Sequence, residues 1–298
     1  WDRYRGGEQI DGLLAARERG RVGRFAPTSV KIMQDGVVEN FTAGVLDPYL
    51  GADGAPTDNR GKSFVDPEEL KAHVVRLDAE GFQVHFHAIG ERAIREALDA
   101  VEAARTANGM NDLRHHIAHI QVVHPDDVPR FGELGVVANG QPLWAQNDGA
   151  MRHLTTPFLG AERSRWQYPF RSLVESGAVL AFGSDWSVTT ADPIQEMHVA
   201  VNRTAAESDP IPDSPRATAP FLPEEAIDLA TGIRAFTMGS AFVNHLDDVT
   251  GSIEVGKYAD LVVLDRNLFE HPTTEIHAAT TQLTLVEGER VFTAADFG

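Results

Sequence analysis

The sequence predicts an α/β protein in which helices cover a parallel sheet. Two observations indicate this class. Short apolar stretches alternate with helical stretches of about 10–15 residues, and several apolar stretches end in a polar residue able to do chemistry. The second observation favours a (β/α)8 TIM barrel, because the catalytic groups of such barrels gather at the carboxyl ends of the strands.

The first part of the chain shows this alternation. We expect a helix over residues 11–21 and then a strand that ends at residues 31–33. Residues 40–65 are rich in Gly, Pro and Asp, have no steady period and are too long for an ordinary connection, so they form a candidate active-site loop. Asp66 is a typical N-cap for a helix over residues 67–80.

The alternation continues, and then the chain changes character. Further strands are expected over residues 82–87, 115–123, 135–141 and 178–185, and further helices over residues 91–104, 125–135, 169–177 and 193–202. Short strands with glycine turns follow residue 250. We therefore expect a barrel domain over residues 1–247 and a small β-sandwich appendage over residues 248–298.

Composition excludes several classes of partner and site. A formal charge of −18 repels phosphate, so neither nucleic acid nor an anionic membrane is an expected partner. No apolar run approaches the ~20 residues that cross a bilayer, and no secretory signal pattern opens the sequence, so we expect a cytoplasmic protein. With no cysteine in the chain, a metal site must use His, Asp, Glu or a modified Lys.

Four polar residues lie at predicted strand ends: Lys31, His87, His119 and Asp185. The stretches between them are long enough for one or more βα units each, so in a barrel they converge on one mouth. Two histidines and a carboxylate suit Zn²⁺ or a similar divalent ion. Such an ion lowers the pKa of a bound water from about 16 to roughly 7.

Five blocks of the sequence resemble a known family. They are VKIMQDG, QVHFHAIGERA, RHHIAHIQVV, FGSDWSV and GSIEVGKYADLVVLD. In this order they are similar to segments of the amidohydrolase superfamily, and the branch that they most resemble is that of metal-dependent hydrolases similar to N-substituted formamide deformylase. The resemblance covers nearly the whole chain and corresponds to the C-terminal half of the family's sequence.

The resemblance implies a role for each strand-end residue. Lys31 matches the metal-binding lysine of strand 4, which is often carboxylated, and His87 and His119 match the ligands of strands 5 and 6. Asp185 matches the aspartate of strand 8, which commonly serves as both ligand and proton shuttle. Residues 251–265 match the return into a β-sandwich that both chain ends build.

The chain departs from the family at its start. Family members open with a His-x-His pair on strand 1, far upstream of the lysine, whereas only thirty residues precede Lys31 here. The sequence begins with Trp1 rather than methionine, and we expect the true N-terminus to be missing. Strands 1 to 3 are expected to come from the N-terminal half of the same protein or from a complementing chain. The sequence does not decide whether the protein forms a homo-oligomer.

Other polar residues of these blocks have two readings each. His85 lies one pleat below the strand-5 ligand and is expected to be a core or neighbouring residue rather than a ligand. His115 and His116 come earlier on their strand, where solvated or helix-capping roles are expected. Asp35 and Glu91 either orient ligands or are surface charges.

The predicted chemistry is metal-assisted hydrolysis of a C–N bond in a small amide-like or formamide-like substrate. One or two ions, most simply zinc, would be held by the residues that the resemblance implies, and Asp185 would carry the proton to the leaving nitrogen. Trp144 and Trp186 either line the substrate pocket or pack under loops. The alternative is a non-catalytic fragment or pseudo-enzyme that acts as a structural partner, because the strand-1 pair is missing.

Overall fold

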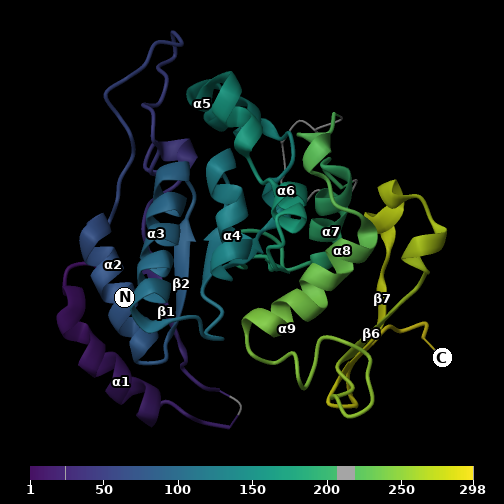
Figure 1. Cartoon of the computed structure of the whole chain (residues 1–298). Helices are drawn as coiled ribbons and strands as arrows, with labels where there is room; N and C mark the ends of the chain where they lie inside the picture. Colours follow the sequence, from purple (N-terminus) through teal and green to yellow (C-terminus); the bar gives the residue numbers. More distant parts are fainter. Residues whose placement is uncertain (24, 207–218, 298) are drawn as a thin grey trace. The chain divides into compact units, whose positions relative to one another are not determined.

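The computed structural model describes residues 1–23, 25–206 and 219–297. Figure 1 shows its helices and strands along the chain. The chain divides into two compact units, of which the first contains residues 1–139 and 152–179 and the second contains residues 140–151 and those from 180 onward. The domain boundary expected near residue 248 lies inside the second unit and stays a prediction.

A parallel sheet organises the first unit. Strands β1 (Ser29–Met33), β2 (Gln83–Ala88), β3 (His116–His119) and β4 (Val137–Gly140) pair in parallel in chain order. Helices connect them, as the alternation of apolar and helical stretches predicts. The predicted α/β class with a parallel sheet is confirmed.

The described helices of the first unit begin within three residues of their predicted starts, except α5 (Thr156–Arg163), where no helix was expected. The others are α1 (Ile10–Arg19), α2 (Pro67–Ala79), α3 (Glu91–Asn108), α4 (Val128–Leu134) and α6 (Phe170–Glu175). Asp66 caps α2 by accepting hydrogen bonds from the backbone N–H groups of Glu68 and Glu69. Helices α2 and α3 pack along each other beside β1 and β2 (Figure 1).

The core of the first unit forms around β2 and α3. Val84 and Phe86 on β2 are fully buried, and full burial of one such side chain stabilises the fold by roughly 1.5–3 kcal/mol. A second apolar cluster lies under the long loop and includes Val38, Val45, Tyr49, Ile89, Val122 and Leu159. The loop of residues 40–65 is therefore anchored by its own buried side chains.

Strands β3, β4 and β5 (Leu180–Phe182) are shorter than predicted, and residues after β3 and β5 have a left-handed backbone. Strand β3 ends at His119 instead of residue 123, because His119 (φ 80°) and Ile120 (φ 43°) adopt left-handed conformations that a strand does not accommodate. Strand β5 likewise ends before Asp185, whose φ is 52°. Apolar sequence alone does not reveal such a conformation.

The second unit contains β5, three helices within the described residues and an antiparallel sheet. The helices are α7 (Pro193–Asn202), α8 (Leu229–Arg234) and α9 (Ser240–Val243), and the sheet has the order β6 (Leu261–Leu264), β7 (Thr281–Val286), β8 (Glu289–Thr293). Glu287 and Gly288 both have positive φ, as a tight turn between β7 and β8 requires. The short C-terminal strands with a glycine turn are confirmed.

Short 3-10 or π-helical turns complete the secondary structure. They are η1 (Gly6–Gln9), η2 (Val38–Asn40), η3 (Pro125–Asp127), η4 (Pro142–Trp144), η5 (Met151–Thr155), η6 (Ser164–Trp166), η7 (Pro223–Glu225), η8 (Ala235–Gly239), η9 (Leu268–Glu270) and η10 (Thr273–Ala278). In the part of the chain that the structure describes, no helix has the length and apolar character to cross a bilayer.

Candidate functional site

Two predicted ligands meet at the carboxyl ends of β2 and β3. The imidazole rings of His87 and His119 lie 4.4 Å apart between centroids, at an interplanar angle of 66°, and both residues are buried. In the sheet register His87 pairs with Ala118, so a regular strand would turn the side chain of His119 to the opposite face. The left-handed backbone of His119 breaks this alternation and lets the two rings meet.

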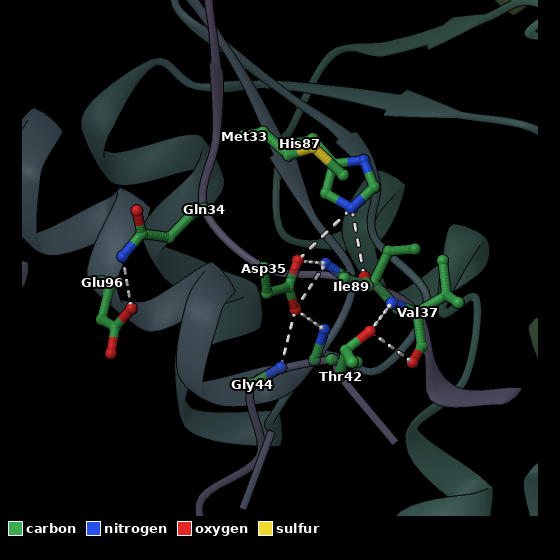
Figure 2. A network of polar contacts seen from close by, with 12 residues as sticks. Met33, Gln34, Asp35, Val37, Thr42, Gly44, His87, Ile89 and Glu96 are labelled. Carbon is green, nitrogen blue, oxygen red and sulfur yellow. Dashed lines mark hydrogen bonds and ion pairs between the residues drawn. The ribbon is translucent and has the colours of Figure 1, made fainter. Parts of the chain in front are cut away.

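His87 is held by the segment that follows β1. Its Nε2 lies 3.1 Å from the carbonyl oxygen of Gly36 and 3.6 Å from Oδ1 of Asp35 (Figure 2). Because a carbonyl oxygen only accepts, Nε2 carries the proton and donates it to Gly36, which leaves the lone pair on Nδ1. This is the arrangement expected of a metal-binding histidine, whose second nitrogen donates to a carbonyl or carboxylate.

Asp35 ties the ends of two strands together. Its buried carboxylate accepts hydrogen bonds from the backbone N–H groups of Ile89, Gly90 and Gly44 (Figure 2). Burial raises the pKa of Asp35 to about 7, although these backbone donors lower it. A Cβ on Gly90 would lie 2.2 Å from the carbonyl oxygen of Gly44, so only glycine fits this turn.

Lys31 contacts a histidine on the neighbouring strand. Its Nζ is 2.8 Å from Nε2 of His85, its register partner on β2. The ring of His85 lies 4.2 Å from the ring of His116, its register partner on β3. These three side chains form a row across β1, β2 and β3 on the face of the sheet that His87 also shares.

Both histidines of this row are neutral. Burial lowers the pKa of His85 to about 2, with further lowering by His116 and Lys31, and burial lowers the pKa of His116 to about 3. The prediction of a solvated or helix-capping role for His116 is therefore wrong, since this residue is buried within the sheet. His116 pairs in register with His85. The sequence of one strand does not reveal which residue of the next strand lies opposite, so this burial was not visible in the sequence.

The expectation for His115 is also wrong. Its side chain is completely buried, its Nδ1 accepts a hydrogen bond from the backbone N–H of Val84, and its Nε2 lies 2.8 Å from Oδ2 of Asp78 on α2. His115 precedes β3 and points away from the row of His85 and His116, because neighbouring residues of an extended chain face opposite sides. It belongs to a buried polar cluster between the sheet and its covering helices.

The remaining predicted site residues belong to the second unit. Asp185 follows β5, is exposed and has the left-handed backbone noted above. Trp144 is half-buried at the end of η4, and the side chain of Trp186, next to Asp185, is 72% exposed. Backbone strain at a polar residue is a recurrent feature of functional sites, and both His119 and Asp185 show it.

The long loop beside the first unit's strand ends is held by charged side chains. Arg163 on α5 donates to the carbonyl oxygens of Asp47 and Pro48 at 2.6 and 2.8 Å. Glu91, at the start of α3, is buried and accepts a hydrogen bond from the backbone N–H of Leu46. Burial raises the pKa of Glu91. Glu91 therefore binds the loop and is not a surface charge.

The donor set fits part of a metal site. The rings of His87 and His119 lie side by side, so the pair suits two imidazole ligands of a zinc-like ion. Among residues 1–23, 25–206 and 219–297, no group of three or more His, Asp or Glu side chains is arranged to hold an ion. The first unit thus supplies two adjacent nitrogen donors, with Lys31 nearby on the same face.

Comparisons with known proteins identify a family and several relatives. Residues 10–292 match the family model described as "Amidohydrolase family". Protein LONG AFTER FAR-RED 3 of Arabidopsis thaliana is 33% identical over 264 residues, which cover 88% of this chain and 42% of that protein. N-substituted formamide deformylase of Arthrobacter pascens is 27% identical over 237 residues, which cover 79% of this chain and 41% of that protein.

A solved structure supports the same grouping. The crystal structure of an uncharacterized metal-dependent hydrolase from Pyrococcus furiosus is similar with a TM-score of 0.65 and 28% sequence identity. The match covers 86% of this chain and 49% of that one. The chain therefore spans about half the length of the relatives that it matches.

Proposed function

This chain belongs to the amidohydrolase family, and from that premise we propose that it takes part in metal-dependent hydrolysis of a C–N bond. The observation that carries the proposal is the pair His87 and His119, whose rings lie 4.4 Å apart at the carboxyl ends of adjacent parallel strands. The parallel strands would belong to a (β/α)8 barrel, and residues 248–298 to a small β-sandwich.

We assign the ligand roles to Lys31, His87, His119 and Asp185. The support for His87 is its Nε2, which donates to Gly36 and so fixes the tautomer that carries its lone pair on Nδ1. The support for Lys31 is its place in register on the strand next to His85, on the same face as His87. Zinc fits these donors best, and carboxylation of Lys31 would turn its amine into an oxygen ligand.

When bound, a divalent ion lowers the pKa of a water molecule and polarises the substrate carbonyl. Asp185 would accept a proton from the attacking water and return it to the leaving nitrogen, which is the usual task of a general acid–base carboxylate. Asp35 would keep His87 in one tautomer by fixing the backbone around it. Trp144 and Trp186 would line the substrate pocket with aromatic surface.

One relative supports the proposed substrate class. It is named N-substituted formamide deformylase, which favours an amide or formamide whose nitrogen carries a substituent. A small molecule of this kind needs no basic surface, in keeping with the charge of −18. The cytoplasm is the proposed location.

Metal analysis and a substrate panel test this proposal together. The chain, and a version extended to the length of its relatives, would be purified, assayed for bound zinc and offered a panel of amides and formamides. We expect bound divalent metal and hydrolysis, with Asp185→Asn lowering kcat by about 10²–10⁴-fold. Asp296→Asn, which changes an exposed carboxylate near the C-terminus, is the matched control.

Two results would overturn the proposal. The first is the lack of divalent metal in both versions, which would favour the alternative of a non-catalytic structural partner. The second is hydrolysis that Asp185→Asn leaves unchanged, because the assigned proton transfer would then be made by another group.

A further inference from the structure

The proposed ligand Lys31 makes a contact that the function described so far does not use. Its Nζ lies 2.8 Å from Nε2 of His85, and the two residues are register partners on β1 and β2. The next partners on the same face of these strands are Met33 and His87, two residues further on. The contact therefore lies one pleat, about 7 Å of strand, before the His87 ligand position and on the same face.

His85 is itself fixed in place. Its ring lies against the ring of His116, at 4.2 Å between centroids, and its Nε2 faces Lys31. A lysine side chain loses up to about 2 kcal/mol of rotamer entropy when it is held in one conformation. The His85 ring on β2 is held in place by the His116 ring on β3. A hydrogen bond to this fixed ring restricts the conformations of the Lys31 side chain.

The chemistry of the partner matters as much as its position. A carboxylate beside Lys31 would pair with the ammonium ion and keep the nitrogen charged, whereas a neutral imidazole offers one lone pair and no charge. A lysine whose amine reacts with carbon dioxide must be neutral, because its nitrogen lone pair forms the new N–C bond. One C–O bonding pair then moves onto oxygen, and one proton leaves the nitrogen for the solvent.

The product of that reaction also fits the contact. A carboxylated lysine retains one N–H group on Nζ and carries beyond it two oxygens that share one negative charge. That single N–H needs an acceptor, and Nε2 of His85 lies in place to be one. With this bond made, the oxygens must point away from His85, and rotation about the side chain is restricted.

From these observations we propose that His85 is a positioning residue for Lys31. It accepts a hydrogen bond from Nζ in both the amine and the carboxylated form, and so directs the metal-binding end of this side chain. This inference rests on the proposed function, since it gives His85 a role toward an assigned ligand. His85 acts through Lys31 and is not assigned contact with substrate.

The decisive experiment follows Lys31 itself by NMR. The sequence contains only four lysines, Lys31, Lys62, Lys71 and Lys257, so a chain labelled with ¹³C and ¹⁵N in lysine gives few signals, and Lys31→Arg identifies the one from Lys31. His85→Leu removes the acceptor at similar volume, and His85→Gln offers an amide oxygen near the place of Nε2. His271→Leu changes a partly exposed ring elsewhere and is the matched control.

We expect His85→Leu to shift the Lys31 side-chain signal toward the position of a hydrated lysine amine, while His85→Gln and His271→Leu leave it near its wild-type position. Incubation with ¹³C-bicarbonate should give a carbamate signal in the wild-type chain that His85→Leu loses and His85→Gln retains. Zinc affinity should fall about 10–100-fold in His85→Leu, as for other residues that orient ligands.

Each outcome decides one question. A Lys31 signal that His85→Leu leaves unchanged would overturn the inference, even if the wild-type chain binds metal and hydrolyses amides. A lack of divalent metal in both the chain and its extended version would overturn the proposed function, and the NMR readout would still report the contact. If His85→Leu does not fold, Lys31→Met gives the reciprocal test, since the imidazole ¹⁵N signals of His85 must then shift.

Discussion

Two histidine–aspartate pairs lie near opposite ends of β3 and its neighbours, and they differ in nearly every other respect. At the amino end, His115 contacts Asp78 at 2.8 Å. At the carboxyl ends, His87 lies 3.6 Å from Asp35. Both carboxylates are buried, yet the pKa of Asp78 is lowered to about 2 and the pKa of Asp35 is raised to about 7.

The donors around each carboxylate explain the difference. Burial raises the pKa of Asp78, but hydrogen bonds from His115, Asn111 and Asn108 outweigh it, and Arg105 lies 3.4 Å away. Asp35 receives its hydrogen bonds from backbone N–H groups, which do not compensate for its burial. The first pair is a saturated structural cluster, whereas the second lies at the carboxyl ends of the strands with a carboxylate whose pKa is raised, as is common at functional sites.

The largest expected effect follows from breaking the Asp78 cluster. Asp78→Ala leaves the buried Arg105 and His115 without their partner, so the free energy of unfolding should fall by about 3–5 kcal/mol. Urea denaturation measures this loss. Asp112→Ala, which removes an exposed carboxylate paired with Arg114, should change stability by less than about 1 kcal/mol. Equal losses for the two variants would show that the buried cluster contributes no more to stability than an exposed ion pair does.

The second prediction breaks the other pair. Asp35→Asn replaces one accepting oxygen by an N–H₂ donor that faces backbone N–H groups. The backbone of Ile89 and Gly90 should then shift, and His87 should no longer be held in one orientation. We expect zinc affinity to weaken about 10–100-fold, measured by competition with a chelator. Asp66→Asn is the control, because Asn caps the start of α2 as well as Asp does. Unchanged zinc affinity in a folded Asp35→Asn variant would remove Asp35 from the site.

A third prediction concerns acid stability. The folded pKa of Asp78, about 2, lies below its ordinary value of 3.8, so the ionised form is the one that stabilises the fold. Its contribution is present above the ordinary value and is lost as the pH falls through about 2. Between pH 5 and pH 2 the wild-type chain should lose about 2 kcal/mol more unfolding free energy than Asp78→Asn. Urea denaturation at each pH measures the free energy of unfolding. An equal loss in the two proteins between pH 5 and pH 2 would contradict the assignment.

The smallest effect is expected from an exposed ion pair on the same helix as Asp78. Lys71 contacts Glu68 at 2.8 Å on the surface of α2. Lys71→Met should change the free energy of unfolding by no more than about 0.5 kcal/mol, because solvent screens such pairs. A thermal melt followed by circular dichroism measures it. A loss comparable to that of Asp78→Ala would mean that burial is not what separates the two kinds of contact.

Much of the first unit was predictable from local pattern. The N-cap Asp66, the helix after it and the strand over residues 82–87 were all visible in the sequence, and the structure confirms them within one or two residues. These features depend on hydrogen bonds and periodicities over a few neighbouring residues, so the order of residues is enough to reveal them.

The roles of individual histidines were less accessible. The sequence placed His87 and His119 at strand ends, but it gave no sign that His119 has a left-handed backbone, which ends β3 and lets the two rings meet. The burial of His115 against Asp78 was missed for a similar reason, because its partner lies 37 residues away on a covering helix.

By itself, the sequence determined the alternation of strands and helices, the residue types available for chemistry and the family to which they belong. Only the tertiary structure decided which side chains share a face: that Lys31 meets His85, that His85 meets His116, and that Asp35 lies beside His87. The physical reason is the register of parallel strands, since a shift of one residue would turn each of these side chains to the other face of the sheet.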